Sequence, residues 1–113
     1  MDQLSGLDAS FIYAETASAP MHIAPLMIYD PSTAPYGFVR FKEILRIFEQ
    51  RLKHTAVFRR KLFTVPFHLD QPYWVEDDNF DLEFHLRHIA LPRPGDWRQL
   101  CILVARLHSR SLD

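Results

Sequence analysis

The feature that most constrains the fold of this chain is a helical apolar pattern between residues 41 and 53. Apolar side chains recur three, four, seven and eleven residues after the first, which is the spacing of one face of an α-helix. These positions are Phe41, Ile44, Leu45, Phe48 and Leu52. The opposite face carries Lys42, Glu43, Arg46, Glu49 and Lys53. The pattern predicts an amphipathic helix with a packed stripe and a solvated face that needs no ligand.

A second helix is predicted near residues 6–15. Its apolar positions are Leu4, Leu7, Phe11 and Ile12, and Ser5 or Asp8 is suited to cap its start. The sequence Ala19-Pro20 is expected to end this element, because proline disfavours helical geometry in the residue before it.

A third helix is predicted to start at Asp96. Gln99 follows three residues later, as the partner residue of a capping box does. The apolar stripe of this helix is Leu100, Leu103, Val104 and Leu107. Pro92-Arg93-Pro94-Gly95, just before it, has the composition of a turn.

The segments between the helices are predicted to contain strands. Residues 21–29 are almost wholly apolar, which is typical of a short strand covered on both faces. Pro25 lies within this segment and removes a hydrogen-bond donor, which favours an edge position or a bulge. The next eight residues, from Asp30 to Gly37, have turn chemistry and predict a loop.

Later in the sequence, residues 61–65 and 73–75 flank a loop that contains Pro66, Asp70 and Pro72, so an antiparallel pair is expected. Residues 81–90 alternate between apolar and polar, which predicts a half-buried strand. The order of helix, strand, helix, several strands and helix indicates a mixed α+β unit.

Composition narrows the class of protein. A chain of 113 residues suggests one domain or less, against roughly 100–200 residues for a typical domain. Its hydrophobic content of 48% argues against disorder. Its formal net charge of −1 gives no general attraction to nucleic acid, so no nucleic-acid partner is expected.

Cys101 is the only cysteine, which excludes an internal disulfide and a cysteine-rich zinc site. Its apolar neighbours predict a packed thiol rather than a nucleophile. The first residues lack the basic and apolar regions of a secretory signal, and no apolar stretch approaches the ~18 residues of a membrane span. We therefore expect a cytoplasmic protein, with peripheral attachment to the inner face of the membrane left open.

The sequence contains six histidines, each of which is a candidate metal ligand or catalytic base. His85 and His88 form an H-x-x-H, but on a strand this spacing directs them to opposite faces, which disfavours a shared metal. His85 is expected to face solvent and His88 to be half-buried. His54 and His108 lie at helix ends, where a cation interacts favourably with the helix dipole.

Two histidines have other surroundings. His68 lies in a loop and has no partner nearby in the sequence. His22 opens the apolar segment, where a buried histidine with satisfied hydrogen bonds is favoured over a functional one.

An acidic cluster of Glu76, Asp77, Asp78 and Asp81 lacks the glycine and the spacing of a calcium loop, so a solvated turn is expected. The sequence also has no phosphate loop, dinucleotide fingerprint or G-x-S-x-G elbow. The residues alone therefore predict no catalytic residue, no cofactor-binding residue and no metal ligand.

Several motifs nevertheless resemble the wax ester synthase/diacylglycerol acyltransferase family of bacteria. At the amino terminus these are Leu4-Ser5-Gly6-Leu7-Asp8-Ala9-Ser10-Phe11, Glu15-Thr16 and Ala19-Pro20-Met21-His22-Ile23. In the middle they are Phe58-Arg59-Arg60-Lys61-Leu62, Tyr73-Trp74-Val75-Glu76-Asp77, Phe80-Asp81-Leu82 and His85-Leu86-Arg87-His88. The last are Leu91-Pro92-Arg93-Pro94-Gly95 and Leu107-His108-Ser109-Arg110-Ser111-Leu112-Asp113. The resemblance covers essentially the whole chain, in order.

The resemblance implies the amino-terminal portion of a chloramphenicol-acetyltransferase-like, CoA-dependent acyltransferase fold. In that fold two similar halves, each with a mixed sheet and flanking helices, surround a tunnel. The implied activity is transfer of a fatty acyl group from acyl-CoA to diacylglycerol, giving triacylglycerol, or to a long-chain alcohol, giving a wax ester. Acyl-CoA is a co-substrate, and no further cofactor is implied.

The catalytic signature that the resemblance implies is HHxxxDG, whose second histidine acts as general base on the acceptor hydroxyl. The present sequence has no adjacent histidine pair. We therefore expect residues 1–113 to be a single incomplete domain that is inactive alone, with the signature lying beyond Asp113. Strands left without partners are expected to favour self-association, because unpaired edges expose hydrogen-bonding groups.

Two alternatives remain open. One is a non-catalytic module that binds lipid, a membrane or lipid droplet, or a complementary acyltransferase half. Nine phenylalanines and the basic cluster Arg59-Arg60-Lys61 motivate it, although core aromatics and a solvated basic turn explain both features. The other is an independent enzyme that uses His22, His85 or His88, for which no nucleophile or base–orienter pair is visible.

Overall fold

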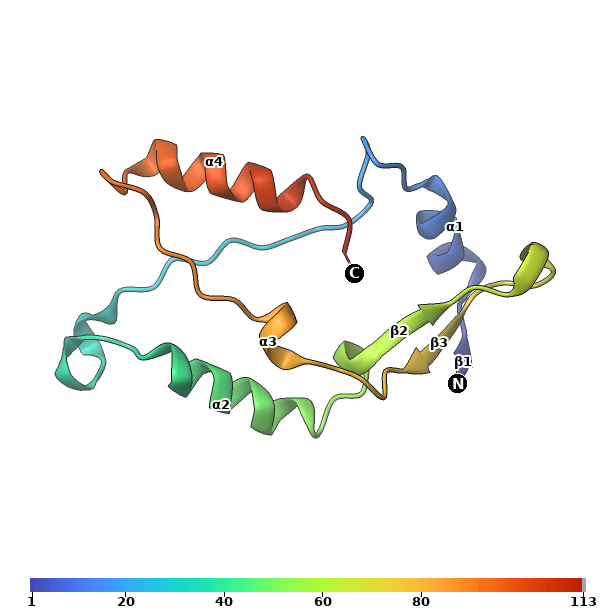
Figure 1. The fold of residues 1–113 in the computed structure, drawn as a ribbon, viewed down its shortest axis with the longest axis horizontal. Coiled ribbons are helices and arrows are strands. Elements are labelled where there is room, and N and C mark those ends of the chain that lie inside the picture. Colours follow the sequence, from blue (N-terminus) through green and yellow to red (C-terminus); the bar gives the residue numbers. More distant parts are fainter. Residues whose placement is uncertain (113) are drawn as a thin grey trace.

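The computed structural model describes residues 1–112, which form four α-helices and a small antiparallel sheet (Figure 1). In chain order the elements are β1 (Asp2–Gln3), α1 (Gly6–Ala14), α2 (Phe41–Leu52), β2 (Arg60–Phe63), β3 (Tyr73–Glu76), α3 (Leu82–His85) and α4 (Trp97–His108). Short 3-10 turns span Pro31–Thr33, Pro35–Gly37, Val57–Arg59 and Pro66–His68. The mixed α and β composition expected from the sequence is confirmed.

The sheet has the strand order β1-β3-β2, and both pairings are antiparallel. Trp74 at its centre pairs with Leu62 on β2 and with Asp2 on β1. The hairpin of β2 and β3 is the antiparallel pair predicted from residues 61–65 and 73–75. The additional strand is β1, which the sequence did not reveal because two residues carry no periodicity.

Helix α1 begins where its capping residue predicts. The Ser5 hydroxyl accepts a hydrogen bond of 3.1 Å from the backbone N–H of Asp8, and this satisfies one of the free donors of the first turn. The helix ends at Ala14, before the proline expected to end it. Residues 16 and 19 then form an isolated antiparallel bridge, so the chain has already turned when it reaches Pro20.

The buried apolar core lies where β1, α1 and the hairpin loop meet. Leu4 is 3% exposed and Ala9 is 2% exposed, and Pro72 is fully buried beside them in the fold. The N–H of Leu4 donates a hydrogen bond of 2.9 Å to the carbonyl of Pro72, which extends the pairing of β1 with β3. Among the described residues, only Leu4, Ala9 and Pro72 are buried.

The predicted amphipathic helix is α2, and its bounds match the apolar pattern. It packs beside α3, and the ring of Phe41 stacks on that of His88 at 5.0 Å. Four stripe residues are half-buried and Phe48 is exposed, so this face is less completely covered than the pattern predicted.

The chain is extended for its size. Its accessible surface is 10019 Å², whereas a compact protein of 13.3 kDa is expected to expose about 6,500 Å². Its radius of gyration is 17.6 Å, against about 13 Å for a compact domain of this length. Much of the apolar surface is therefore not covered by the chain itself.

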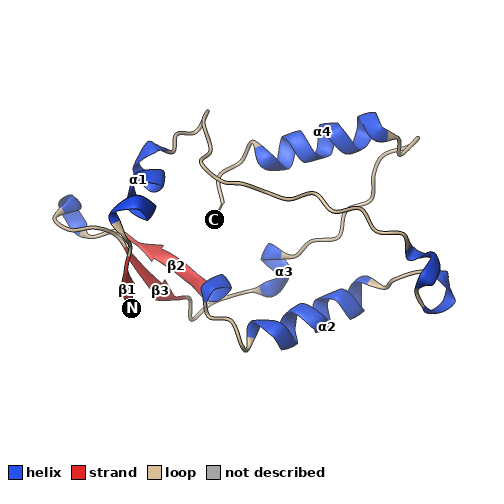
Figure 2. Cartoon of the chain, turned by 180° about the vertical axis from the view of Figure 1, so that it is seen from behind, coloured by secondary structure: helices blue, strands red, loops and turns tan. Residues whose placement is uncertain are grey.

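The strand predicted for residues 21–29 is absent. This segment is extended but pairs with no strand, and Ile23 is 97% exposed. The apolar run met the composition of a covered strand, but a strand also needs a hydrogen-bonding neighbour, and Pro25 lacks an N–H. The segment instead runs alongside α4, as both views show (Figures 1 and 2).

The strand predicted for residues 81–90 is also wrong. Asp81 accepts a hydrogen bond of 3.1 Å from the N–H of Glu83 and so caps the short helix α3. The N–H of Leu86 closes this helix by donating to the carbonyl of Leu82 at 2.8 Å. With no neighbouring strand to pair with, the local cap outweighs the alternating pattern. His85 is exposed as predicted, whereas His88 is exposed rather than half-buried.

Helix α4 begins as predicted, because Asp96 accepts a hydrogen bond of 3.0 Å from the N–H of Gln99. The preceding turn is closed by the N–H of Gly95, which donates to the carbonyl of Pro92 at 2.8 Å. Gly95 has a φ of +66°, a conformation that glycine adopts without steric cost. None of the helices in residues 1–112 has the length and apolar character needed to cross a membrane.

Candidate functional site

The H-x-x-H histidines do not form a shared site. His85 stacks on Phe80 at 5.1 Å, and His88 stacks on Phe41 at 5.0 Å. Within residues 1–112, no group of three or more histidine, cysteine, aspartate or glutamate side chains could hold a metal ion. The pair is thus divided between two aromatic partners, although not by the strand geometry that was expected.

A different histidine pair is brought together by the fold. The rings of His22 and His108 lie 4.5 Å apart in an edge-to-face arrangement with an interplanar angle of 67°. His22 is half-buried, and its Nδ1 atom is buried without a hydrogen-bond partner. The expectation of a satisfied buried histidine is therefore wrong. Sequence spacing could not reveal the pair, because the two residues are joined only through the packing of residues 21–29 beside α4.

An apolar groove lies between these two segments and has a volume of about 700 Å³. We refer to it as the α4 groove. Residues 22–26 form one side, and α4 with Leu112 forms the other; the lining residues on this second side are Trp97, Leu100, Cys101, Val104, Ala105, Leu107, His108 and Leu112. Cys101 is exposed and lines this groove, so the packed thiol expected from its neighbours is wrong.

The α4 groove is lined by apolar side chains together with two histidines, one cysteine and one tryptophan, and by no carboxylate, ammonium or guanidinium group. Residues 22–26 run antiparallel to the helix, with His22 beside His108 near the helix end. At the other end, Leu26, Trp97 and Leu100 also line an adjoining depression of about 440 Å³. The apolar surface therefore continues along α4.

A second hollow, of about 730 Å³, lies between α2, Arg59 and α3. Its lining mixes charges of both signs, including Lys42, Glu49 and Glu83. It lies along the solvated face of α2, although Leu45 and Leu52 of the apolar stripe also line it, and it holds no histidine, cysteine or serine.

The basic cluster Arg59-Arg60-Lys61 is neutralised by acids on the facing strands. Arg59 pairs with Glu76 at 2.9 Å, Arg60 with Asp2 at 3.1 Å and Lys61 with Asp77 at 3.3 Å. Each cation therefore has an acidic partner within the sheet or its adjoining turn. This arrangement removes the main reason to expect an anionic-membrane surface here.

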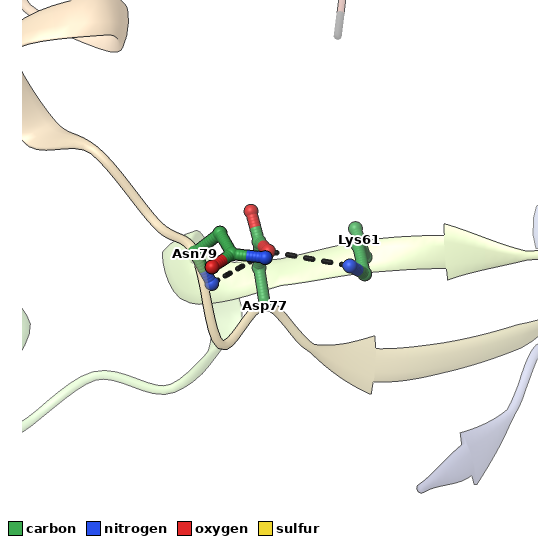
Figure 3. A network of polar contacts seen from close by, with 3 residues as sticks. All are labelled: Lys61, Asp77 and Asn79. Carbon is green, nitrogen blue, oxygen red and sulfur yellow. Dashed lines mark hydrogen bonds and ion pairs between the residues drawn. The ribbon is translucent and has the colours of Figure 1, made fainter.

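The acidic cluster is a turn, as predicted (Figure 3). The carboxylate of Asp77 accepts a hydrogen bond of 3.1 Å from the N–H of Asn79 and one of 3.3 Å from Lys61. The backbone N–H of Asn79, followed by the Lys61 ammonium, lowers the pKa of Asp77 below its ordinary value. Oδ1 of Asp77 thus joins the turn to β2.

The remaining two histidines, His54 and His68, lie in turns. His54 follows α2 and is exposed, and its N–H donates to the carbonyl of Arg51 at 3.0 Å. His68 ends the turn Pro66–His68, with its ring 6.3 Å from that of Tyr13. Neither contacts a second group that could position it as a base.

The catalytic-domain model of the wax ester synthase/diacylglycerol acyltransferase family matches residues 4–113. This chain belongs to that family. The match includes nearly all of the described residues. It also includes Asp113, the last residue of the motif Leu107–Asp113, which lies outside the described residues.

Relatives within the wax ester synthase/diacylglycerol acyltransferase family agree. The putative diacylglycerol O-acyltransferase Rv1760 of Mycobacterium tuberculosis strain H37Rv is 41% identical over 115 residues, which are 100% of this chain and 22% of the relative. The putative diacylglycerol O-acyltransferase Rv3087 of the same strain is 36% identical over 113 residues, again 100% of this chain and 24% of the relative. A probable diacylglycerol O-acyltransferase, tgs3, is 38% identical over 111 residues, covering 98% of this chain and 40% of the relative.

This chain thus spans about a fifth of the length of the first two of these relatives. No solved structure matches it. The HHxxxDG signature that the family resemblance implies is not present in the 113 residues, whose histidines are all separated from one another.

Proposed function

We propose that this chain provides the amino-terminal part of the catalytic domain of a long-chain acyl-CoA-dependent acyltransferase. The reaction is esterification of diacylglycerol or of a long-chain alcohol, and the architecture is chloramphenicol-acetyltransferase-like. The observation that carries the proposal is the family match over residues 4–113, with identities of 36–41% to relatives along nearly the whole chain.

The catalytic base is expected to come from further polypeptide of the same domain. A general base needs a hydrogen-bonding partner that fixes its tautomer and aims its free nitrogen. His22 has no partner at Nδ1, and its ring neighbour is the edge of another imidazole rather than a carboxylate. The pair is therefore poorly suited to take the proton of an acceptor hydroxyl, which favours a structural or ligand-contacting part for these residues.

The exposed apolar surface fits the same proposal. The chain exposes about 3,500 Å² more than a compact protein of its mass, and a standard stable protein interface buries only about 1,600 Å² in total. Surface on this scale is suited to contact with the rest of an acyltransferase domain. We therefore propose that residues 1–113 form an incomplete domain that does not turn over acyl-CoA alone.

The decisive experiment is a chimera in which this chain replaces the matching segment of the 41% identical relative. Transfer of radiolabelled palmitate from palmitoyl-CoA is measured with diacylglycerol and with hexadecanol as acceptors. The chimera is expected to form triacylglycerol or wax ester, whereas the 113-residue chain forms neither. The unaltered relative is the control. A folded but inactive chimera, with an active control, would contradict the proposal.

A non-catalytic binding module is a second candidate, favoured by the exposed segment of residues 21–29. The paired basic cluster argues against an anionic membrane as its partner and leaves a polypeptide or an uncharged lipid. An inactive chimera together with a tight complex between this chain and the remaining part of the relative would favour this candidate.

A further inference from the structure

We propose that His22 and His108 form a pH-sensitive switch. With both imidazoles neutral, residues 22–26 lie along α4 as the structure shows them, which we call the closed state. With both imidazoles protonated, the segment is released from the helix, which we call the open state. Such a conformational change lies beyond the proposed acyltransferase function and does not depend on it.

The two rings form a specific contact between the segment and the helix. His108 is the last residue of α4, and the two ring centroids lie 4.5 Å apart. Residues 21–29 belong to none of the strands in the described part of the chain, so no ladder hydrogen bonds hold them in place. The position of residues 22–26 therefore depends on side-chain contacts, among which the imidazole pair is the one that acquires charge in mild acid.

A charged His22 is poorly accommodated in the closed state. Its Nδ1 atom is covered by the protein and has no hydrogen-bond partner. A neutral imidazole carries one proton, which can reside on Nε2, whereas an imidazolium carries a proton on each nitrogen. The closed state would then bury a charged N–H donor that has no acceptor, which is more costly than leaving a neutral nitrogen unpaired.

A charged His108 adds repulsion between the rings. Two unit positive charges 4.5 Å apart repel each other even when they are screened as in bulk water, where the interaction is equivalent to about a fivefold change in an equilibrium constant. The dipole of α4 favours a cation at the carboxyl end of the helix, so the charge on His108 is compatible with the helix itself. The repulsion is therefore relieved by movement of residues 22–26 away from the helix.

The acids near the pair do not offset this charge. Within residues 1–112 neither imidazole forms an ion pair, and no carboxylate lines the α4 groove. Glu15 follows α1 and is the acid nearest to His22 in the sequence. Its carboxylate accepts a hydrogen bond of 3.1 Å from the N–H of Met21, so it contacts the backbone before His22.

The other titratable groups near the pair favour the same direction. Arg106 and Arg110 lie two residues before and after His108 and carry positive charge at every pH considered. The thiol of Cys101 also lines the groove, and a thiol is uncharged in acid. The closed state therefore binds fewer protons than the open state, so closing is favoured at high pH and is lost as the pH falls from about 8 to about 5.

Two other histidines are expected to respond differently. His85 stacks on Phe80 at 5.1 Å and His88 stacks on Phe41 at 5.0 Å. A cation over an aromatic face is attracted by the ring, so protonation strengthens these contacts. Mild acid is thus expected to release residues 22–26 while α2 and α3 keep their contacts.

The switch is tested in the full chain by the distance between two nitroxide labels, measured by pulsed electron paramagnetic resonance. The labels are attached at Ile23→Cys, where the side chain is 97% exposed, and at Ile102→Cys, on α4 outside the groove lining, with Cys101→Ala. An excess of unlabelled chain keeps the measured pairs within one molecule. The ratio of open to closed populations is expected to rise at least about fivefold from pH 8 to pH 5, with the helix content unchanged by circular dichroism.

The deciding variant is His22→Phe, which keeps an aromatic ring beside His108 but cannot be charged. Its open-to-closed ratio is expected to change less than about twofold over the same pH range. His88→Phe is the matched control, because it removes an imidazole that stacks on Phe41 instead, and it should respond as the unaltered chain does. A His22→Phe variant that opens in acid as much as the unaltered chain would overturn the proposal.

A second variant covers the case in which His22→Phe is already open at pH 8. His108→Phe removes the same repulsion from the helix side, and a full acid response in this variant would overturn the proposal, as would an open state of both variants at pH 8. No response of the unaltered chain, or opening that accompanies loss of helix, would overturn it too. Opening only below about pH 4.5, or opening abolished by Glu15→Gln, would assign the change to the carboxylate and not to the imidazoles.

Discussion

The side-chain amide of Gln3 donates a hydrogen bond of 2.7 Å to Oδ1 of Asp70, which ties β1 to the loop between β2 and β3. The same carboxylate accepts 2.8 Å and 2.9 Å hydrogen bonds from the N–H of Gln71 and the hydroxyl of Tyr73. The Gln71 N–H, followed by the Tyr73 hydroxyl, lowers the pKa of Asp70, and the same contact with Asp70 raises the pKa of Tyr73. One carboxylate thus fixes the hairpin loop and the amino terminus together.

Acid is expected to release β1. Because the folded pKa of Asp70 lies below its ordinary value of 3.8, the unfolded chain takes up the proton first as the pH falls. The stabilisation is present above that ordinary pKa and is lost as the pH falls through the folded value. The protection of the Leu4 amide, which is bonded to Pro72, relative to intrinsic exchange at each pH, should fall over this range more than the protection of the α2 amides. The variant Asp70→Asn should lose this difference; an unchanged profile would contradict the role of Asp70.

The cap of α4 provides a test of local stability. Replacing Asp96 by alanine removes the acceptor for the N–H of Gln99 and should cost about 1 kcal/mol in the free energy of helix unfolding. Asp96→Asn keeps an acceptor in the same place and should cost much less. The stability loss of each variant is measured by a urea titration in which the exchange rates of the α4 amides are monitored. Equal losses in the two variants would mean that charge, and not the capping hydrogen bond, is what matters.

The ion pairs of the sheet predict weak interaction with anionic lipid. In a flotation assay with phosphatidylglycerol vesicles, the unaltered chain is expected to remain unbound in the bottom fraction of the gradient. The triple variant Asp2→Asn, Glu76→Gln and Asp77→Asn frees the three cations that these acids neutralise and should shift the chain toward the vesicles at low salt. If the unaltered chain floated to the same extent as the triple variant, the basic cluster would have to be considered a membrane-binding surface.

Self-association is expected from the exposed apolar segments and the unpaired strand edges. Size-exclusion chromatography with light scattering should show a mass that rises with protein concentration, and the thermal midpoint should move with it. The variant Ile23→Lys adds a charge at a side chain that is 97% exposed and should reduce the association. A sharp, reversible melt that is independent of concentration would contradict this expectation.

Elements that are stabilised by contacts close in sequence were predictable. The bounds of α2 follow from its apolar spacing, and Ser5 and Asp96 cap the helices that they were expected to cap. The antiparallel hairpin follows from two short β-prone segments and an intervening loop. In each case the deciding hydrogen bonds or contacts lie within a few residues or across one turn.

Features that depend on distant partners were not predictable. The apolar run from Met21 to Tyr29 has the composition of a strand, but composition does not say whether another strand lies beside it. The alternation of apolar and polar residues after Asp81 predicted a strand, but a capping hydrogen bond of 3.1 Å to Asp81 stabilises a short helix there instead. The candidate groove was missed for the same reason, since His22 and Cys101 line one surface only because residues 22–26 lie along α4.

The small core has a consequence for the heat capacity of unfolding. A compact domain of 113 residues is expected to change by about 1.4–1.7 kcal/mol/K on unfolding, mostly from newly hydrated apolar groups. Here Leu4, Ala9 and Pro72 are the only buried residues among those described, and the folded chain already exposes about 3,500 Å² more than a compact protein of its mass. Calorimetry should therefore find a smaller change and a flatter dependence of stability on temperature. The missing heat capacity should reappear as a large negative change when the apolar surface is covered by its partner.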